Sequence, residues 1–187
     1  GVTIGQHEAG AALCVNGQIV AACEEERYTR IKDARGLLPK WSISACLRQA
    51  GIKWEAIDLI VTPGITYRDV ISRLTIYLNH LFGSCPRIEP IHHQLAHLYA
   101  AFYGSGFKKG LVVSLDATGD GACGMLGVGD KEGGIRVLEE IPSSNSLGFF
   151  YTLMTYYLGF EDGDEYKVMG LAPYGDSCID LKAVVEV

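Results

Sequence analysis

The dipeptide Asn16-Gly17 stands between two apolar runs, and this arrangement constrains the fold more than any other feature of the sequence. Both central residues of a type I′ turn need a positive φ, which asparagine and glycine adopt readily. The runs on either side, residues 11–15 and 18–23, are therefore expected to pair as antiparallel strands. Residues 1–5 are expected to form a strand before them. The first part of the chain is thus predicted to be a three-stranded antiparallel meander.

Helical and strand patterns alternate after this meander. Apolar spacing and glycine stops predict helices at residues 41–50, 69–82, 92–103, 146–158 and 164–171. Short apolar runs predict strands at residues 57–62, 87–91, 110–116, 125–129 and 135–141. A meander followed by alternating helices and strands is typical of an α/β architecture, with a mixed sheet flanked by helices.

Composition narrows the class of protein. The chain has 187 residues, of which 48% are hydrophobic and 20% charged, as in a globular protein. The net charge of −6 argues against a nucleic-acid partner, because phosphate contacts need clustered basic residues. The apolar runs are too short for a membrane span, and no signal peptide is visible at the start. The six cysteines form no CxxC pair, which argues against a zinc ribbon. We therefore expect a cytoplasmic protein that has no membrane partner.

Two histidines share one face of the helix expected at residues 92–103. His93 and His97 are four residues apart, so their rings lie one turn apart on that face. The apolar side chains of this helix fall on roughly the opposite side. Two imidazoles at this spacing can reach one metal ion. The alternative is a pair of solvent-facing histidines, because the glutamate of the HExxH motif is missing.

An acidic residue follows the apolar run 111–115, nineteen residues after His97. This residue, Asp116, could add an oxygen ligand to the two imidazoles. It precedes the segment Ala117-Thr118-Gly119-Asp120-Gly121, whose glycines let backbone N–H groups approach a phosphate. The alternative is a tight hairpin turn, in which Asp and Gly are favoured because they accept a positive φ.

Two further segments concentrate polar residues. The first, from Glu24 to Lys32, is rich in charge and is typical of a solvated face. The second, from Glu165 to Gly175, has the pattern of a capped amphipathic helix that ends in a loop containing Pro and Gly.

Taken together, these segments resemble one protein family. The motifs are His7-Glu8-Ala9-Gly10-Ala11-Ala12-Leu13 with Glu24 to Lys32, then His92-His93-Gln94-Leu95-Ala96-His97, then Glu165 to Gly175. They are similar to motifs of the O-carbamoyltransferases of antibiotic and nodulation-factor biosynthesis, and they stand in the same order. The resemblance implies an actin-like ATPase (ASKHA, ribonuclease H-like) fold. Residues 1–187 would form its N-terminal lobe, with a second lobe and a YrdC-like domain outside this chain.

The resemblance also implies an activity. In this family, ATP and carbamoyl phosphate give carbamoyl-adenylate, and the carbamoyl group then passes to a hydroxyl of a small-molecule acceptor. We expect the 187-residue chain to need the remaining lobe and the YrdC-like domain as partners, and to be inactive alone. The alternative is a noncatalytic metal- or nucleotide-binding domain that scaffolds or regulates a partner.

Site residues are implied in the same way. His93, His97 and Asp116 match metal ligands, with Fe²⁺ as the expected ion and Zn²⁺ or Mg²⁺ as alternatives. Lys32 and His7 match catalytic residues near the carbamoyl group. There the lysine could hold an oxygen as charge develops, and the histidine could accept the proton of the acceptor. The residues expected to bind ATP or carbamoyl-adenylate are Thr118, Gly119, Asp120, Gly121, Lys167 and Gly170.

Overall fold

The structure, a computed structural model, describes residues 1–4 and 8–176. The strands are β1 (Val2–Thr3), β2 (Gly10–Val15), β3 (Gln18–Glu24), β4 (Leu59–Pro63), β5 (Arg87–Ile91), β6 (Lys109–Gly119), β7 (Ala122–Asp130) and β8 (Gly134–Pro142). The α-helices are α1 (Glu26–Thr29), α2 (Lys40–Ala50), α3 (Val70–Phe82), α4 (His93–Ser105), α5 (Leu147–Tyr157) and α6 (Glu165–Leu171). Short 3₁₀ helices lie at Lys32–Ala34, Trp54–Ala56, Ser143–Asn145 and Ala172–Tyr174.

The predicted meander is confirmed. β2 pairs with both β1 and β3 in the antiparallel sense. The turn between β2 and β3 has φ angles of 50° at Asn16 and 78° at Gly17, as the sequence predicts.

β4 and β5 then form a parallel pair, with Leu59 opposite Arg87. A parallel pair needs a crossover, and α3 provides it.

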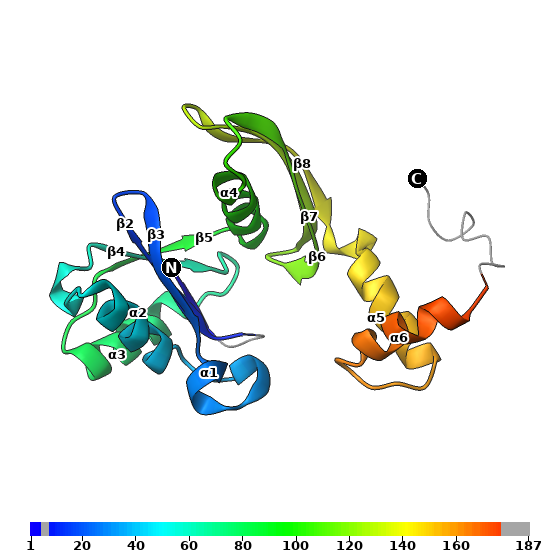
Figure 1. The fold of residues 1–187 in the computed structure, drawn as a ribbon, viewed down its shortest axis with the longest axis horizontal. Helices are drawn as coiled ribbons and strands as arrows, with labels where there is room; N and C mark the ends of the chain where they lie inside the picture. The colour runs from blue at the N-terminus through cyan, green and yellow to red at the C-terminus, as the bar shows by residue number, and fades with distance from the viewer. Residues whose placement is uncertain (5–7, 177–187) are drawn as a thin grey trace.

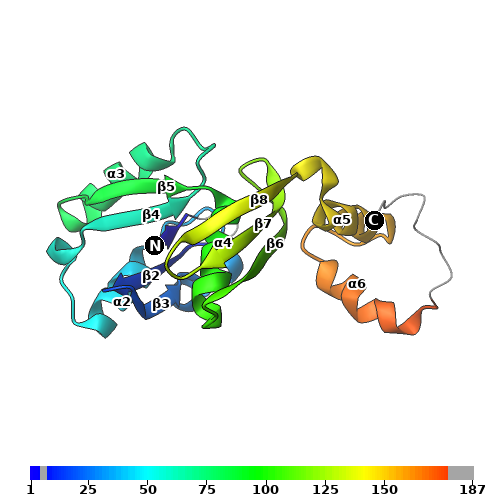
Figure 2. The same ribbon diagram turned by 90° about the horizontal axis from the view of Figure 1, so that it is seen from above.

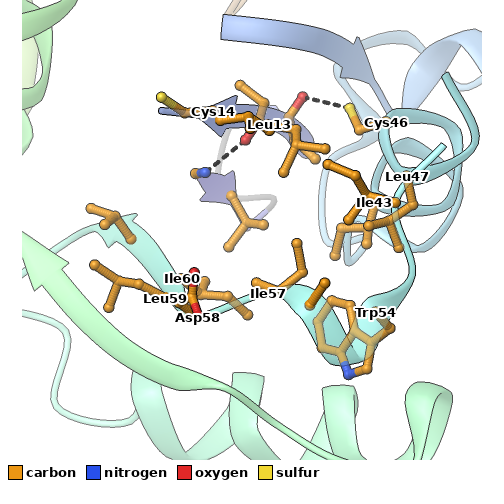
Figure 3. A pocket seen from close by; sticks show the side chains of 18 of the residues that line it. Leu13, Cys14, Ile43, Cys46, Leu47, Trp54, Ile57, Asp58, Leu59 and Ile60 are labelled. Carbon is orange, nitrogen blue, oxygen red and sulfur yellow. Dashed lines mark hydrogen bonds between the residues drawn. The ribbon is translucent and has the colours of Figure 1, made fainter. Parts of the chain in front are cut away.

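The α/β class is confirmed, but hydrogen bonds divide the described strands into three sheets instead of one mixed sheet. The sheets are β1-β2-β3, β4-β5 and β6-β7-β8. β1 lies beside β4 without pairing to it. Since β1 has only two residues, it is too short to carry a ladder on both of its edges. An apolar cavity of about 450 Å³ lies between β2, α2 and β4, and Figure 3 shows its lining.

Two apolar cores hold the described part of the chain together. The first joins α2, α3 and the strands around them, and Leu74 and Leu78 of α3 are fully buried in it. The second lies where α4 packs on the sheet β6-β7-β8, with Leu98 and Phe102 facing Val112. Figures 1 and 2 show α4 against this sheet and α5 with α6 beyond it, at one end of the molecule.

One member of the charged segment Glu24 to Lys32 is buried, against the expectation of a solvated face. The Glu25 carboxylate accepts hydrogen bonds from the backbone N–H of Trp41 at 3.0 Å and of Ser42 at 2.8 Å. It also accepts one from the Ser42 hydroxyl at 2.8 Å. A carboxylate is stable there because the first turn of a helix offers unpaired N–H groups. The pKa of Tyr77 is raised to about 12, mainly by burial and to a lesser extent by the nearby negative charge of Glu25.

None of the helices in the described ranges has the length and apolar character that a membrane span requires.

Candidate metal centre

Helix α4 carries two of the three candidate ligands. The helix begins at His93, and the Nδ1 of His92 caps it by accepting a hydrogen bond from the backbone N–H of Gln94 at 3.2 Å. The apolar side of the helix, with Leu98, is buried on the sheet. His93 is half-buried and His97 is exposed, so the pair lies off the apolar stripe, as its spacing predicts.

The structure brings His93, His97 and Asp116 together. His93 Nε2 lies 2.8 Å from Asp116 Oδ2 and 3.1 Å from His97 Nε2. His97 Nε2 lies 3.7 Å from the same carboxylate oxygen. One donor atom from each residue falls within 4.8 Å of the other two. Two imidazole nitrogens and a carboxylate oxygen suit Fe²⁺ or Zn²⁺, whereas Mg²⁺ prefers a shell of oxygen atoms.

Asp116 reaches the histidines through an irregularity in β6. The strand was expected to end at Asp116, but it runs on to Gly119, and its register against β7 shifts between Leu115 and Gly119. Such a shift lets a strand continue while it redirects a side chain. The backbone N–H of Ala117 donates to Asp116 Oδ1 at 2.6 Å, and the Ser146 hydroxyl donates to the Asp116 carbonyl at 3.4 Å.

After Asp116 the chain completes β6 at Gly119 and turns into β7 at Asp120 and Gly121, so the tight hairpin turn that the sequence left open as an alternative is present. The turn residues Asp120 and Gly121 have φ angles of 54° and 90°. The Thr118 hydroxyl lies 2.6 Å from the Ser143 hydroxyl. Burial raises the pKa of Asp120, but hydrogen bonds from Thr66, His93 and Ile65 outweigh it and hold the pKa below its usual value. A phosphate-binding role for this turn stays a prediction.

Gly119 lies against a candidate ligand. A Cβ added at Gly119 would stand 2.2 Å from Cγ of His93, which is far inside van der Waals contact. Glycine is therefore required here so that the imidazole can occupy its place beside Asp116.

We expect Gly119→Ala to displace the His93 ring and to lower the affinity for Zn²⁺ by at least about 10-fold, as for other changes beside a ligand. Isothermal titration with Zn²⁺ measures the change. Gly104→Ala is the matched control. Gly104 lies in α4, the helix that carries His93, and its added Cβ would meet nothing within 4 Å. If Gly119→Ala and Gly104→Ala bind Zn²⁺ equally, the contact with His93 does not set the geometry of the site.

The structure also brings Lys32 and Lys167 together, although they come from distant segments. Each ammonium nitrogen lies 5.8 Å from the ring centroid of Tyr166, a distance at which a cation and an aromatic face attract. Lys167 also pairs with Asp164 at 2.8 Å. Lys32 is exposed and available to a ligand.

Two predicted site residues gain no structural support. His7 lies outside the described residues. Gly170 lies in α6, where an added Cβ would meet nothing within 4 Å, so no contact there explains a glycine. The roles assigned to both residues stay predictions.

Sequence reasoning missed one polar residue of α4. Gln94 is fully buried, and its side-chain amide donates to the carbonyl of Ala122 at 3.2 Å, which ties the start of the helix to β7. The available signal was the position of Gln94 itself, a polar residue between the two histidines of the motif.

Comparisons with known proteins identify the family. A family model described as the carbamoyltransferase N-terminus matches residues 66–186. Nodulation protein NolNO of Sinorhizobium fredii is 38% identical over 91% of this chain and 28% of its own length. The uncharacterized protein sll1178 of Synechocystis is 32% identical over 98% of this chain and 37% of its own length. The chain therefore belongs to the carbamoyltransferase family, as the motifs predict, and it spans a minor part of the length of these relatives.

Among solved structures, the ROK hexokinase from Thermus thermophilus is similar with a TM-score of 0.49 and 18% identity. The match covers 95% of this chain and 69% of the hexokinase chain.

Proposed function

We propose that this chain carries the metal- and phosphate-binding lobe of an ATP-dependent O-carbamoyltransferase. The observation that supports this most is the cluster of His93, His97 and Asp116, whose donor atoms lie within 4.8 Å of one another in a chain of the carbamoyltransferase family. An actin-like ATPase fold is part of the proposal, because the meander followed by alternating helices and strands has the order that this fold implies.

The donor set fits a divalent ion of the Fe²⁺ or Zn²⁺ type. When bound, such an ion supplies Lewis acidity toward a phosphate oxygen of the nucleotide. The protein's part is to hold the donors. His93 Nε2, His97 Nε2 and the Asp116 carboxylate would be the ligand atoms, and Gly119 leaves the space that the His93 ring needs.

The proposed chemistry is carbamoyl transfer from carbamoyl-adenylate to an acceptor hydroxyl. The acceptor oxygen bonds to the carbamoyl carbon, the bond from that carbon to the phosphate oxygen breaks, and AMP leaves with the bonding electron pair. In this proposal, Lys32 stabilises negative charge that grows on an oxygen during this step. His7 accepts the proton that the hydroxyl loses.

The surface of α5 and α6 supports the need for a further lobe. Several large apolar side chains are exposed there, namely Leu147, Phe149, Leu153, Tyr156, Tyr157, Tyr166, Met169 and Leu171. A soluble protein rarely leaves so large an apolar face open to water, since such faces bind partners or aggregate. We infer that the remaining part of the carbamoyltransferase covers this face and completes the active site.

We expect Lys32→Ala, made in the full-length protein, to lower carbamoyl transfer by about 100-fold, because one charge-stabilising donor is lost. The metal content should stay unchanged, since Lys32 is not among the clustered donors. The assay supplies ATP, carbamoyl phosphate and Fe²⁺ with a panel of aminoglycoside and sugar acceptors, and it detects carbamoylated product by mass spectrometry.

Lys131→Ala is the matched control, because Lys131 is an exposed lysine just after β7. Near-normal transfer by Lys32→Ala would show that Lys32 has no catalytic role and is an ordinary solvent-exposed residue of the charged segment. A wild-type protein that binds metal but forms no carbamoylated product would favour the noncatalytic scaffold instead.

A further inference from the structure

We propose that Asp120 is a positioning residue for the metal centre, which fixes His93 and the loop after β4 in one arrangement. Asp120 would act through its hydrogen bonds and would not itself bind the metal ion. For Asp120 this positioning role replaces the nucleotide-binding role that the resemblance implies. This inference rests on the proposed metal site of His93, His97 and Asp116.

The partly buried Asp120 carboxylate accepts four hydrogen bonds from other parts of the protein. Its Oδ2 accepts hydrogen bonds from the backbone N–H of His93 at 2.8 Å and of Ile65 at 3.2 Å. Its Oδ1 accepts from the backbone N–H and the hydroxyl of Thr66 at 3.0 and 2.7 Å. An ionised carboxylate has about four acceptor sites, so these donors occupy it.

These bonds join three segments that lie far apart in the sequence. Asp120 itself stands in the β6–β7 turn, held in the left-handed region with a φ of 54°. The loop with Ile65 and Thr66 follows β4, and the backbone N–H of Gly64 continues the pairing with β5 by donating to the Ile91 carbonyl at 3.1 Å. His93 follows β5. The loop and the start of α4 therefore lie at the carboxyl ends of two parallel strands, where α/β proteins bind ligands.

His93 is held by two different carboxylates. Asp116 contacts its imidazole, and Asp120 accepts from its backbone N–H, which belongs to the first turn of α4. A negative charge is favourable at a helix N-terminus, so the second contact also stabilises the start of the helix. Because the backbone of His93 is fixed by Asp120, any movement of that carboxylate shifts the imidazole relative to Asp116.

The test is Asp120→Asn in the full-length protein. Asparagine has nearly the same shape, but its NH₂ group cannot accept a hydrogen bond, so the donors on one oxygen lose their partner. We expect Zn²⁺ affinity to fall about 10- to 100-fold, as for other groups that orient metal ligands, with the binding stoichiometry unchanged. In the metal-free protein, amide hydrogen exchange should become at least about 10-fold faster at the amides that lose their acceptor, which are His93 and Ile65 on one oxygen or Thr66 on the other.

Asp130→Asn is the matched control. Asp130 also lies at a turn and accepts from Lys109 Nζ at 2.8 Å and from the backbone N–H of Glu132 at 3.0 Å, but it contacts no candidate ligand. It should leave Zn²⁺ affinity unchanged. Thr66→Val removes only the hydroxyl donor, and it should give a smaller effect of the same kind if Asp120→Asn does not fold.

Wild-type exchange rates at these three amides in Asp120→Asn would overturn the inference. Faster exchange with unchanged Zn²⁺ affinity would also overturn it, because Asp120 would then stabilise the loop alone. A wild-type protein that binds no Zn²⁺ would instead refute the proposed metal site. The exchange data from the metal-free protein would still show whether Asp120 holds His93.

Discussion

Replacing His97 with alanine is expected to abolish high-affinity metal binding. His97 supplies one of three clustered donors, and the change leaves a single imidazole and a carboxylate. The loss in Zn²⁺ affinity should exceed about 100-fold, because removing a ligand has a larger effect than altering the groups around it. Isothermal titration with Zn²⁺, and with Fe²⁺ under anaerobic conditions, measures this loss.

His80→Ala is the control for His97→Ala. His80 is an exposed histidine in the last turn of α3 and belongs to no cluster of candidate ligands in the described part of the chain. It should bind metal like the wild type. Equal affinities in His97→Ala and the wild type would show that this cluster is not a metal centre.

Replacing Glu25 with alanine is expected to destabilise the protein by about 2–4 kcal/mol, because three donors, two of them buried, lose a charged acceptor. These donors are the two N–H groups at the start of α2 and the Ser42 hydroxyl. The neighbouring helix also loses the charge that its N-terminus favours. Urea unfolding followed by circular dichroism measures the difference in the free energy of unfolding.

Glu24→Ala is the control for Glu25→Ala. Glu24 pairs with Arg27 at 2.8 Å, but both side chains are more than half exposed. Exposed ion pairs contribute about 0–1 kcal/mol, so this variant should unfold close to the wild type. Glu25→Gln should fall between the two, since the glutamine retains one acceptor oxygen. Equal stabilities of Glu24→Ala and Glu25→Ala would contradict the capping role.

Local sequence signals were sufficient to place most of the elements. The helices α2 and α3 end as predicted, because Gly51 and Gly83 take positive φ angles of 66° and 78° directly after them. The extension of β6 past Asp116 was not foreseen. It depends on pairing with β7 across an irregular register, which the apolar pattern of one strand does not reveal.

The candidate ligands could be predicted because the signal for the histidines lies within one helix. A spacing of four places His93 and His97 on one face whatever the rest of the fold does. The role of Asp120 could not be predicted, since its partners in the loop after β4 are 54 and 55 residues away. The burial of Glu25 could not be predicted for a different reason. Glu25 stands within a run of charged residues, and only its contact with the start of α2 distinguishes it from its neighbours.

The unequal burial of the two histidines bears on how the protein exchanges its metal. The His97 side chain is 54% exposed, whereas that of His93 is 30% exposed. An ion held here would face solvent on the His97 side, so chelators and competing ions would approach from that direction. The metal recovered with the purified protein would therefore reflect the growth medium and the buffers as well as the preference of the site. Anaerobic purification without chelators, followed by elemental analysis, is the appropriate way to identify the native ion.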